Sequence, residues 1–195
     1  PQLYAILEKA GIATGNNRGL HLLGRMAHDI LICFGPRQGS HPTFVLFDEW
    51  LPKAKSLPRE EALAKITLTY FTSHGPAQIQ DMAWWSGLPM RDIRRGIELA
   101  GKKLQKIEVE GKDYYMTPGL GKVKPTGKAY LLPSFDEFHV AYRDRSASLE
   151  EAHAEHINPG ANGMLSPIVV IDGQMVGTWK RVIKKDTVII TAKPF

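Results

Sequence analysis

Apolar residues recur with a helical period through the centre of the chain, most clearly in residues 90–104. The positions that share one helix face there are Ile93, Ile97, Ala100 and Leu104. The opposite face carries Arg91, Arg94, Arg95, Glu98 and Lys102. The sequence therefore predicts an amphipathic helix with a basic outer surface.

This helix is the third in an order of elements that begins at Pro58. A long helical segment, PREEALAKITLTYFTSHG, is followed by a short helix that Pro76 opens and by a turn that contains Gly87. After the basic helix, QKIEVEGKDYYM has the alternation and the central glycine of a two-stranded hairpin. Three helices and a hairpin in this order predict a winged helix-turn-helix, which presents one helix to a DNA groove.

Residues 1–50 repeat the same design. After a first short helix that Gly11 ends, a second helix to about Asp29 has an apolar stripe of Leu20, Leu23, Met26 and Ala27. Its other face carries Arg18, His21, Arg25 and His28. Two strands follow, Ile30–Phe34 and Thr43–Phe47, with the turn-rich GPRQGSHP between them. The repeat predicts two tandem winged-helix modules, the first incomplete at its N-terminus, and we expect that further sequence precedes Pro1.

The pattern changes at Thr117, where TPGLGKVKPTGK has too little apolar content for a core. Ser148 is placed to cap a short helix in SLEEAHAEHI. The segments PIVVID, GQMVGTWKRVI and TVIITA predict a three-stranded antiparallel meander, with a tight turn at Asp172-Gly173. The expected core positions of this meander are Val169, Ile171, Val176, Val188 and Ile190.

These patterns predict an α+β fold in three parts. Residues 1–53 form a winged helix that is incomplete, residues 54–120 form a second winged helix, and residues 121–195 form a C-terminal β-rich domain. Between the first two parts, LPKAKSLP (residues 51–58) is the expected linker, because its prolines break helices and its lysines favour exposure.

Composition narrows the class of protein further. The chain has 195 residues, 43% of them hydrophobic, and no apolar run approaches the roughly 20 residues of a membrane helix. A lone cysteine, Cys33, excludes an internal disulfide and fits a reducing, cytoplasmic compartment. The formal charge of +5 is compatible with nucleic acid without establishing it. The sequence holds no glycine-rich phosphate loop, no Ser-His-Asp order and no zinc pattern, so we expect neither cofactor nor metal.

The positions of the basic residues suggest where DNA would bind. Candidate contacts on the two helix faces are Arg91, Arg94, Arg95, Lys102, Arg18, His21 and Arg25, and candidates at the two hairpin tips are Arg37 and Lys112. Arginine suits this role because its planar fork matches phosphate oxygens and the guanine edge. The alternative is a solvated surface, in which Asp92 and Glu98 pair locally with the arginines.

With the modules laid out, the chain resembles the winged-helix family that includes the AlkZ-type and YcaQ-type DNA glycosylases. The segments that carry the resemblance are FGPRQGSHPTFVLFDEWLP, HGPAQIQDMAWWSGLP, LLPSFDEFHVAYRDRS and DGQMVGTWKR. The resemblance implies three tandem winged helices followed by a β-rich domain, of which this chain would supply most of the second, the third and the β-rich domain. It also implies an enzyme class that hydrolyses N-glycosidic bonds of alkylated or crosslinked bases.

The resemblance assigns no catalytic residue to this chain. The family's signature is a Gln-x-Gln or Gln-x-Asp on a hairpin of the first winged helix, the module that we expect to be absent here. Gln78-Ile79-Gln80 matches the letters, but it follows Pro76 in a helical pattern and we interpret it as a solvated helix face.

Two other groups of residues have both a functional and a structural interpretation. Trp84 and Trp85 could stack on bases, but neighbours on a helix point about 100° apart, so we expect one or both in the core. A dense charge cluster could hold an acid/base pair, although a structural ion-pair network is the commoner outcome; its members are Asp136, Glu137, Arg143, Asp144 and Arg145.

We therefore expect a monomeric protein that binds double-stranded DNA as the larger part of a glycosylase-like DNA-repair protein. Two alternatives stay open. A winged-helix transcription regulator would use the same basic helices, usually as a dimer that matches two half-sites. A non-catalytic interaction scaffold would pack its winged helices on one another and bind DNA weakly or not at all.

Overall fold

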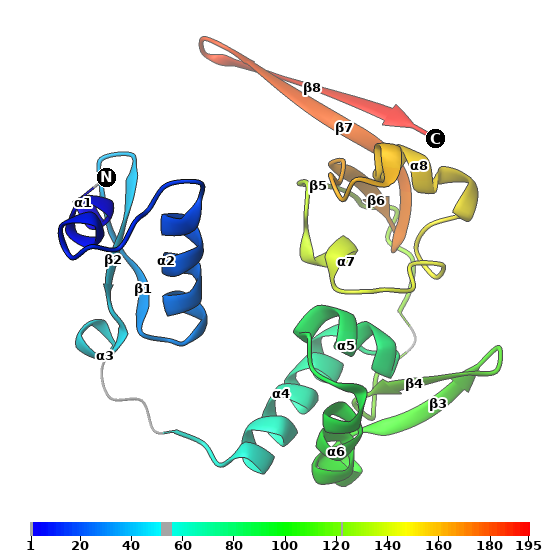
Figure 1. Cartoon of the computed structure of the whole chain (residues 1–195). Helices are drawn as coiled ribbons and strands as arrows, with labels where there is room; N and C mark the ends of the chain where they lie inside the picture. The colour runs from blue at the N-terminus through cyan, green and yellow to red at the C-terminus, as the bar shows by residue number, and fades with distance from the viewer. Residues whose placement is uncertain (1, 52–55, 122) are drawn as a thin grey trace. The chain divides into compact units, whose positions relative to one another are not determined.

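The computed structural model describes residues 2–51, 56–121 and 123–195, and it is a mixed α/β structure (Figure 1). The chain divides into two compact units, Pro1–Ser56 and Leu57–Phe195. Four residues of the expected linker, 52–55, lie outside the described residues. Within the part of the chain that is described, none of the helices combines the length and apolar character needed to cross a lipid bilayer.

The first unit contains three helices and one hairpin. Its elements are α1 (Gln2–Lys9), α2 (Arg18–His28), β1 (Ile32–Gln38), β2 (His41–Leu46) and α3 (Phe47–Trp50). The strands are longer than predicted, since pairing resumes at Gln38↔His41 after an irregularity that follows Gly35. In the expected apolar stripe of α2, Leu23 is buried whereas Leu20 is 61% exposed. The helical period was therefore correct, but a unit of this size buries only part of the stripe.

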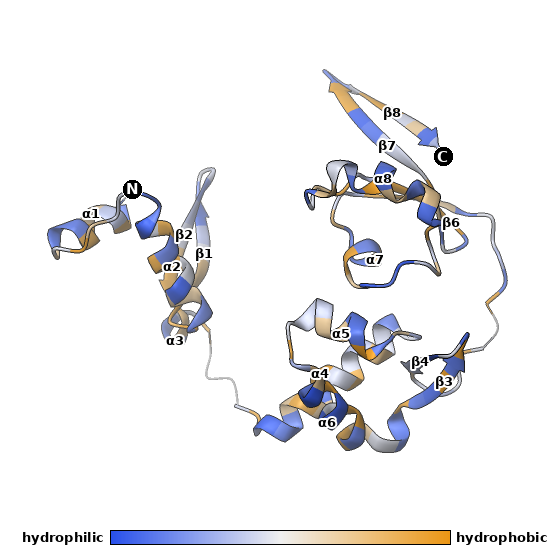
Figure 2. Cartoon of the chain, turned by 45° about the vertical axis from the view of Figure 1, so that its right-hand side comes forward, coloured by the Kyte–Doolittle hydropathy of each residue, from blue (hydrophilic) through white to orange (hydrophobic). Residues whose placement is uncertain are grey.

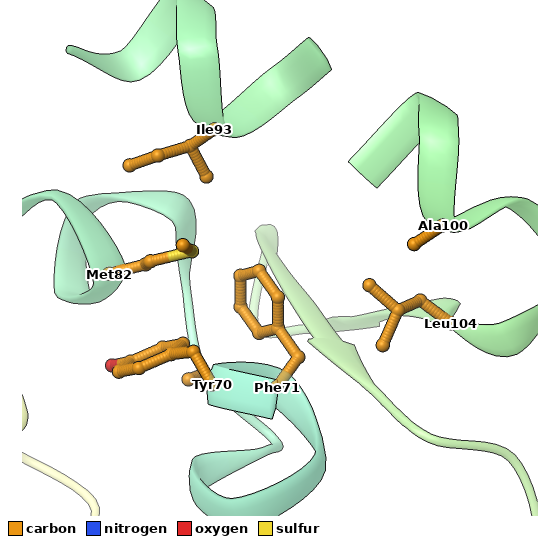
Figure 3. Close-up of a cluster of buried hydrophobic side chains, with 7 residues drawn as sticks. Tyr70, Phe71, Met82, Ile93, Ala100 and Leu104 are labelled. Carbon is orange, nitrogen blue, oxygen red and sulfur yellow. The ribbon is translucent and has the colours of Figure 1, made fainter. Parts of the chain in front are cut away.

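The second unit opens with the three helices and the hairpin that the periodicity predicted. These are α4 (Arg59–His74), α5 (Ile79–Ser86), α6 (Met90–Ala100), the 3₁₀ turn η1 (Gly101–Lys103), β3 (Gln105–Val109) and β4 (Lys112–Met116). Their shared core comprises Tyr70, Phe71, Ala77, Met82, Ile93, Ala100 and Leu104. Figure 3 labels all of these residues except Ala77. Ile97 packs against this core, so the predicted inner face of the basic helix is confirmed.

Helices α4 and α6 approach closely at Gly96. A Cβ atom on Gly96 would lie 2.1 Å from Oγ1 of Thr67 and 2.9 Å from the carbonyl oxygen of Leu63. The glycine therefore permits an interhelical contact that a larger residue would separate.

The C-terminal part contains a four-stranded antiparallel sheet in the order β5-β6-β7-β8. Its strands are β5 (Ala129–Leu132), β6 (Ile168–Ile171), β7 (Gln174–Lys184) and β8 (Thr187–Pro194). The three predicted strands are present, and β5 is an addition that the sequence pattern did not reveal. Asp172 and Gly173 both have positive φ, as a tight hairpin turn requires.

Short helices fill the segment between β5 and β6. They are α7 (Glu137–Val140), the 3₁₀ turn η2 (Glu151–His153), α8 (Ala154–Ile157) and the 3₁₀ turn η3 (Pro159–Ala161). Ser148 does not cap a helix as expected, because its hydroxyl donates to the carbonyl oxygen of Arg145. The buried cluster of this part comprises Leu149, Ile157, Ile168, Val170 and Met175.

The outer half of the β7–β8 hairpin contradicts two expected core positions. Val188 is 57% exposed and Ile190 is 53% exposed. Strand β6 pairs with β7 only as far as Thr178, so beyond this point the hairpin has no neighbour among the described strands. Figure 2 shows both hydrophobic and hydrophilic residues along these two strands. Alternation alone could not reveal that the sheet narrows to two strands here.

The segment 137–146 is bound to helices α4 and α5 by buried hydrogen bonds. The carboxylate of Asp81, 2% exposed, accepts the backbone N–H groups of Gln78 at 2.9 Å, Arg143 at 2.9 Å and Asp144 at 3.0 Å. The hydroxyl of Tyr70 donates to the carbonyl oxygen of Ala141 at 3.0 Å. Burial, and then the nearby Asp81 charge, raises the pKa of Tyr70, so its hydroxyl keeps the proton that it donates.

His139 on α7 is the other buried ionisable group of this segment. It is 3% exposed, and its Nδ1 atom has no hydrogen-bond partner among the described residues. Burial, followed by the charge of Arg145, lowers the pKa of His139 from 6.5 to about 4. The imidazole is therefore neutral in the folded chain at pH 7.

We expect the Asp81→Asn substitution to destabilise the second unit by about 2–4 kcal/mol. The amide would place an NH₂ group against a backbone N–H and remove the charge that strengthens these bonds. Urea unfolding followed by circular dichroism measures the loss. Asp113→Asn is the matched control, since its carboxylate is exposed and, among the described residues, pairs only with Lys106; its cost should stay below about 1 kcal/mol. Equal losses in both variants would contradict the assigned role of Asp81.

We also expect acid to destabilise the fold through His139. An unfolded histidine has a pKa near 6.5, and the folded value is about 4. The unfolded chain therefore binds more protons between these values, so stability is complete above pH 6.5 and falls as the pH drops toward 4, by about 3 kcal/mol in all. Urea unfolding at several pH values measures this slope.

His139→Leu should flatten the pH dependence of stability, because leucine keeps much of the volume and cannot take up the proton. His156→Gln is the control, since His156 is exposed, and this variant should keep the parental slope. A parental slope in His139→Leu would show that another group causes the acid sensitivity.

Candidate nucleic-acid interface

The N-terminal half of α6 carries the most available cations of the predicted DNA-binding face. The side chain of Arg91 is 84% exposed, and its Nε atom lies 3.5 Å from a carboxylate oxygen of Asp92. Asp92 also accepts a 2.6 Å hydrogen bond from Arg59. Arg94 is exposed and forms no ion pair with any of the described residues. These two arginines are oriented toward solvent because the opposite face of α6 is buried in the helical core.

Arg95 is held by carboxylates instead. Its Nη2 atom lies 2.6 Å from Glu60 and its Nη1 atom 3.3 Å from Glu98. The hydrogen bond with Glu60 is the main cause that raises the pKa of Arg95. For this residue the local pairing that the sequence offered as an alternative is present.

Lys102 lies beyond α6 and not on it. The helix ends at Ala100 because Gly101 adopts φ 54° and ψ −131°, a conformation that glycine accommodates readily. Lys102 is exposed in the 3₁₀ turn η1 that follows. The expectation that it continues the helix face was therefore wrong, although contact with DNA from this turn stays a prediction.

Lys112 at the start of β4 is engaged with the C-terminal segment. Its Nζ atom lies 2.7 Å from Oδ2 of Asp144, and the side-chain amide of Gln78 donates to the same oxygen at 3.1 Å. Lys112, followed by Ser146, holds the pKa of Asp144 well below its usual range. The same ion pair raises the pKa of Lys112. The lysine thus links the β3–β4 hairpin to residue 144.

The Gln78-Ile79-Gln80 triplet occupies the start of α5. Gln78 is the half-buried N-cap residue, and its backbone N–H donates to Asp81. Gln80 is exposed in the first turn. The helical placement was predicted correctly, but Gln78 belongs to a hydrogen-bond network and is not a solvated side chain.

Neither tryptophan of α5 is a core residue, in contrast to the prediction. Trp84 is 59% exposed and Trp85 is 38% exposed. Their indole N–H groups donate to the segment that docks on the helix, Trp84 to the carbonyl oxygen of Val140 at 3.1 Å and Trp85 to Glu137 at 2.7 Å. The core side of α5 is filled by Met82 and Asp81, which leaves both indoles outside.

The charged residues of the cluster 136–145 have structural roles, which is the interpretation that the sequence favoured. Most of the groups that they contact, however, lie outside the cluster. Asp136 caps α7 by accepting the N–H of Phe138. Glu137 lies 3.0 Å from Nε2 of His74. Arg145 donates from Nε to the carbonyl oxygen of His139 at 2.8 Å. Hydrogen bonds to backbone groups and to helices α4 and α5 therefore replace the expected ion-pair network.

In the first unit, three of the candidate residues lie on α2. Arg18 and His21 are exposed, and Arg25 pairs with Asp29 at 2.7 Å. Arg37 is exposed in β1, near the turn of the β1–β2 hairpin. Contact of these four residues with DNA stays a prediction.

Sequence reasoning missed Asp81 and His139, which organise the segment between α5 and the sheet. Asp81 stands three residues after the N-cap Gln78, which is the spacing of a capping box and the one signal that could have identified it. No pattern marks His139, because the four-residue helix α7 is too short to show a periodicity.

Comparison with known proteins places the chain in one family. The sequence model of the family described as DNA glycosylase AlkZ-like matches residues 2–195. The chain is 26% identical over 163 residues to an interstrand DNA cross-link repair glycosylase of Streptomyces sahachiroi, which covers 77% of this chain and 43% of that protein.

A solved structure agrees with this assignment. The DNA glycosylase AlkZ of Streptomyces sahachiroi superposes with a TM-score of 0.68 at 26% identity, over 84% of this chain and 46% of that one. The chain thus spans less than half the length of either relative. Because the family match extends over nearly every residue, the chain belongs to the AlkZ-like DNA glycosylase family.

Proposed function

We propose that this chain binds double-stranded DNA as part of a DNA-repair protein of the glycosylase type that acts on alkylated or crosslinked DNA. The observation that carries the proposal is family membership along residues 2–195, together with a helix whose outer face presents Arg91 and Arg94 to solvent. The related Streptomyces protein is a glycosylase for interstrand DNA crosslinks. The chain would act as a monomer, without cofactor or metal.

The order of elements supports a winged helix-turn-helix at α4–α6 and β3–β4, with α6 as the helix that enters the groove. Arg91 and Arg94 lie in its first turns, where a recognition helix contacts DNA. Arg95 and Lys112 would have to give up the carboxylates of Glu60 and Asp144 before they could bind phosphate. We therefore rank Arg91 and Arg94 above the other candidates in this unit.

We further propose that base release is not performed by residues of this chain. Gln80 is exposed on a helix, and Gln78 is bound to Asp144 within a structural network. Neither is presented by a hairpin, the setting that the family signature requires. The chain would supply affinity for DNA, and the chemistry would come from other parts of a longer protein.

Duplex DNA binding should weaken steeply with salt, because each phosphate contact releases counterions and contributes a slope of about −0.9 in log affinity against log salt. In Arg91→Ala/Arg94→Ala we expect lower affinity and a slope shallower by up to about 2. Fluorescence anisotropy of a labelled duplex at several salt concentrations measures both. Alanine favours helix, so circular dichroism should stay unchanged.

Arg95→Ala is the matched control on the same helix. Because Glu60 and Glu98 hold this guanidinium, its removal should change the slope much less than the double substitution does. Parental affinity and slope in the double variant would show that α6 does not bind DNA. Arg18, His21, Arg25 and Arg37 of the first unit would then be the stronger candidates.

The chain should release no free base from an alkylated duplex, because its Gln-x-Gln is helical and lies outside a catalytic hairpin. Chromatography of the supernatant after incubation detects released bases. Release that disappears in Gln80→Ala would overturn this expectation and identify an active site on α5. Release that persists in Gln80→Ala would point to a different catalytic residue in the chain.

A further inference from the structure

A cavity of about 650 Å³ in the second unit lies apart from the basic face of α6. It is formed by the end of α5, helix α7, helix α8 and the turn η3, whose helices Figure 1 labels. Its volume is in the range of small-molecule sites, and aliphatic side chains make up much of its wall. The side chains with distinctive chemistry on this wall are Trp84, Phe135, His139, Arg145, Glu155 and Asn158.

The wall of the cavity includes a half-buried cation, Arg145. Arg145 is half-buried, and it forms no ion pair with any residue in the ranges that the structure describes. Its Nε atom is fixed by the carbonyl oxygen of His139 at 2.8 Å, so the orientation of the guanidinium is set by the backbone of α7. Burial lowers the pKa of Arg145, and the charge of Asp81 offsets this effect only in part. An anionic ligand would compensate this cost.

A second polar group on the wall is also without a partner. His139 is 3% exposed, and its Nδ1 atom makes no hydrogen bond within the described residues. A buried nitrogen without a partner destabilises the folded state. Such groups are usually satisfied by water or by a ligand, and this one shares its cavity with the unpaired Arg145.

Two large aromatic side chains flank these polar groups. Trp84 is 59% exposed and Phe135 is 50% exposed. Phe135 adopts φ 60°, a left-handed conformation that is unfavourable for a bulky residue. Exposed aromatic faces of this kind bind flat ring systems by stacking.

The remaining polar side chains narrow the class of ligand. Glu155 and Asn158 contribute a carboxylate and an amide to the same wall. A simple dianion such as phosphate would be repelled by Glu155, whereas a ligand with amino or hydroxyl donors would bind to it. The ligand should therefore combine an anionic group for Arg145, hydrogen-bond donors for Glu155 and a flat ring for the aromatic side chains.

We propose that this cavity binds a nucleotide, with its phosphate at Arg145, its base between or against Trp84 and Phe135, and its amino or hydroxyl groups at Glu155. The nucleotide is either a free mononucleotide or an unpaired nucleotide of a strand. The site does not depend on the α6 arginines, so binding there and duplex binding by α6 can fail independently.

The test is a titration of the 195-residue chain with adenosine 5′-monophosphate, followed by NMR and calorimetry. The monophosphate should shift the indole N–H resonance of Trp84 and the amide resonances of α8. Adenosine and inorganic phosphate should each bind at least about tenfold more weakly, since each lacks one half of the recognised chemistry. Arg91→Ala/Arg94→Ala should bind the monophosphate as the parent does.

Arg145→Gln should weaken binding of the monophosphate at least about tenfold. Arg143→Gln is the matched control two residues earlier, because the Arg143 side chain is exposed and does not line the cavity; it should bind normally. Phe135→Gly provides a second variant in case Arg145→Gln fails to fold, since glycine tolerates the positive φ. It should weaken binding several-fold.

Three results would overturn the proposal. These are no detectable binding of the monophosphate at about 10 mM, equal losses in Arg145→Gln and Arg143→Gln, and inorganic phosphate that binds as tightly as the nucleotide. Competition with a short single-stranded oligodeoxyadenylate then identifies the source. Displacement of the monophosphate assigns the cavity to a nucleotide within a strand, and retention assigns it to a free nucleotide.

Discussion

The second unit depends on the buried carboxylate of Asp81. Asp81 stands in the first turn of α5 and accepts three backbone N–H groups, one from its own helix cap and two from residues 143 and 144. An isolated buried charge is costly, but the aligned N–H groups of a helix start and of a docked loop supply the compensating dipoles. Because Arg143 and Asp144 are more than sixty residues away in sequence, these bonds join the helical part to the segment between α7 and η2.

Ion pairs within the second unit decide which of the candidate cations remain available to bind DNA. Once Asp144 is fixed next to α5, its carboxylate also accepts Lys112, and the β3–β4 hairpin is tied to the same loop. Glu60 on α4 similarly holds Arg95 on α6. The basic surface that composition suggests is therefore smaller than the count of lysines and arginines implies, and on α6 itself Arg91 and Arg94 are the least constrained cations.

Periodicity predicted the elements whose burial is repeated along one face. The inner face of α6 is of this kind, whereas the tight turn at Asp172-Gly173 was predicted from its Asp-Gly pair. Periodicity failed where a neighbour decides burial, as at Val188 and Ile190, whose strands extend past the last pairing with β6. Periodicity also failed at Trp84 and Trp85, because the segment 137–146 determines which face of α5 is covered, and the pattern of α5 alone does not show it. Candidate charges could be found from the sequence, but their pairing could not, because Lys112 and Asp144 are 32 residues apart.

The segment from Phe135 to Leu149 both docks on the helices and walls the cavity, and these two roles differ in their physical character. The docking bonds are satisfied at both ends: Asp81, Tyr70 and Trp84 all have partners. The cavity side retains a strained Phe135, and within the described ranges it also has an Nδ1 atom of His139 without a hydrogen-bond partner and an Arg145 guanidinium without an ion pair. Unfavourable features of this kind persist where the surrounding structure over-determines them, and they are most common at sites that bind a ligand. The hydrogen bonds to Asp81 hold this segment in place on α5. Because the segment is held there, its cavity side can keep polar groups that lack a partner among the described residues.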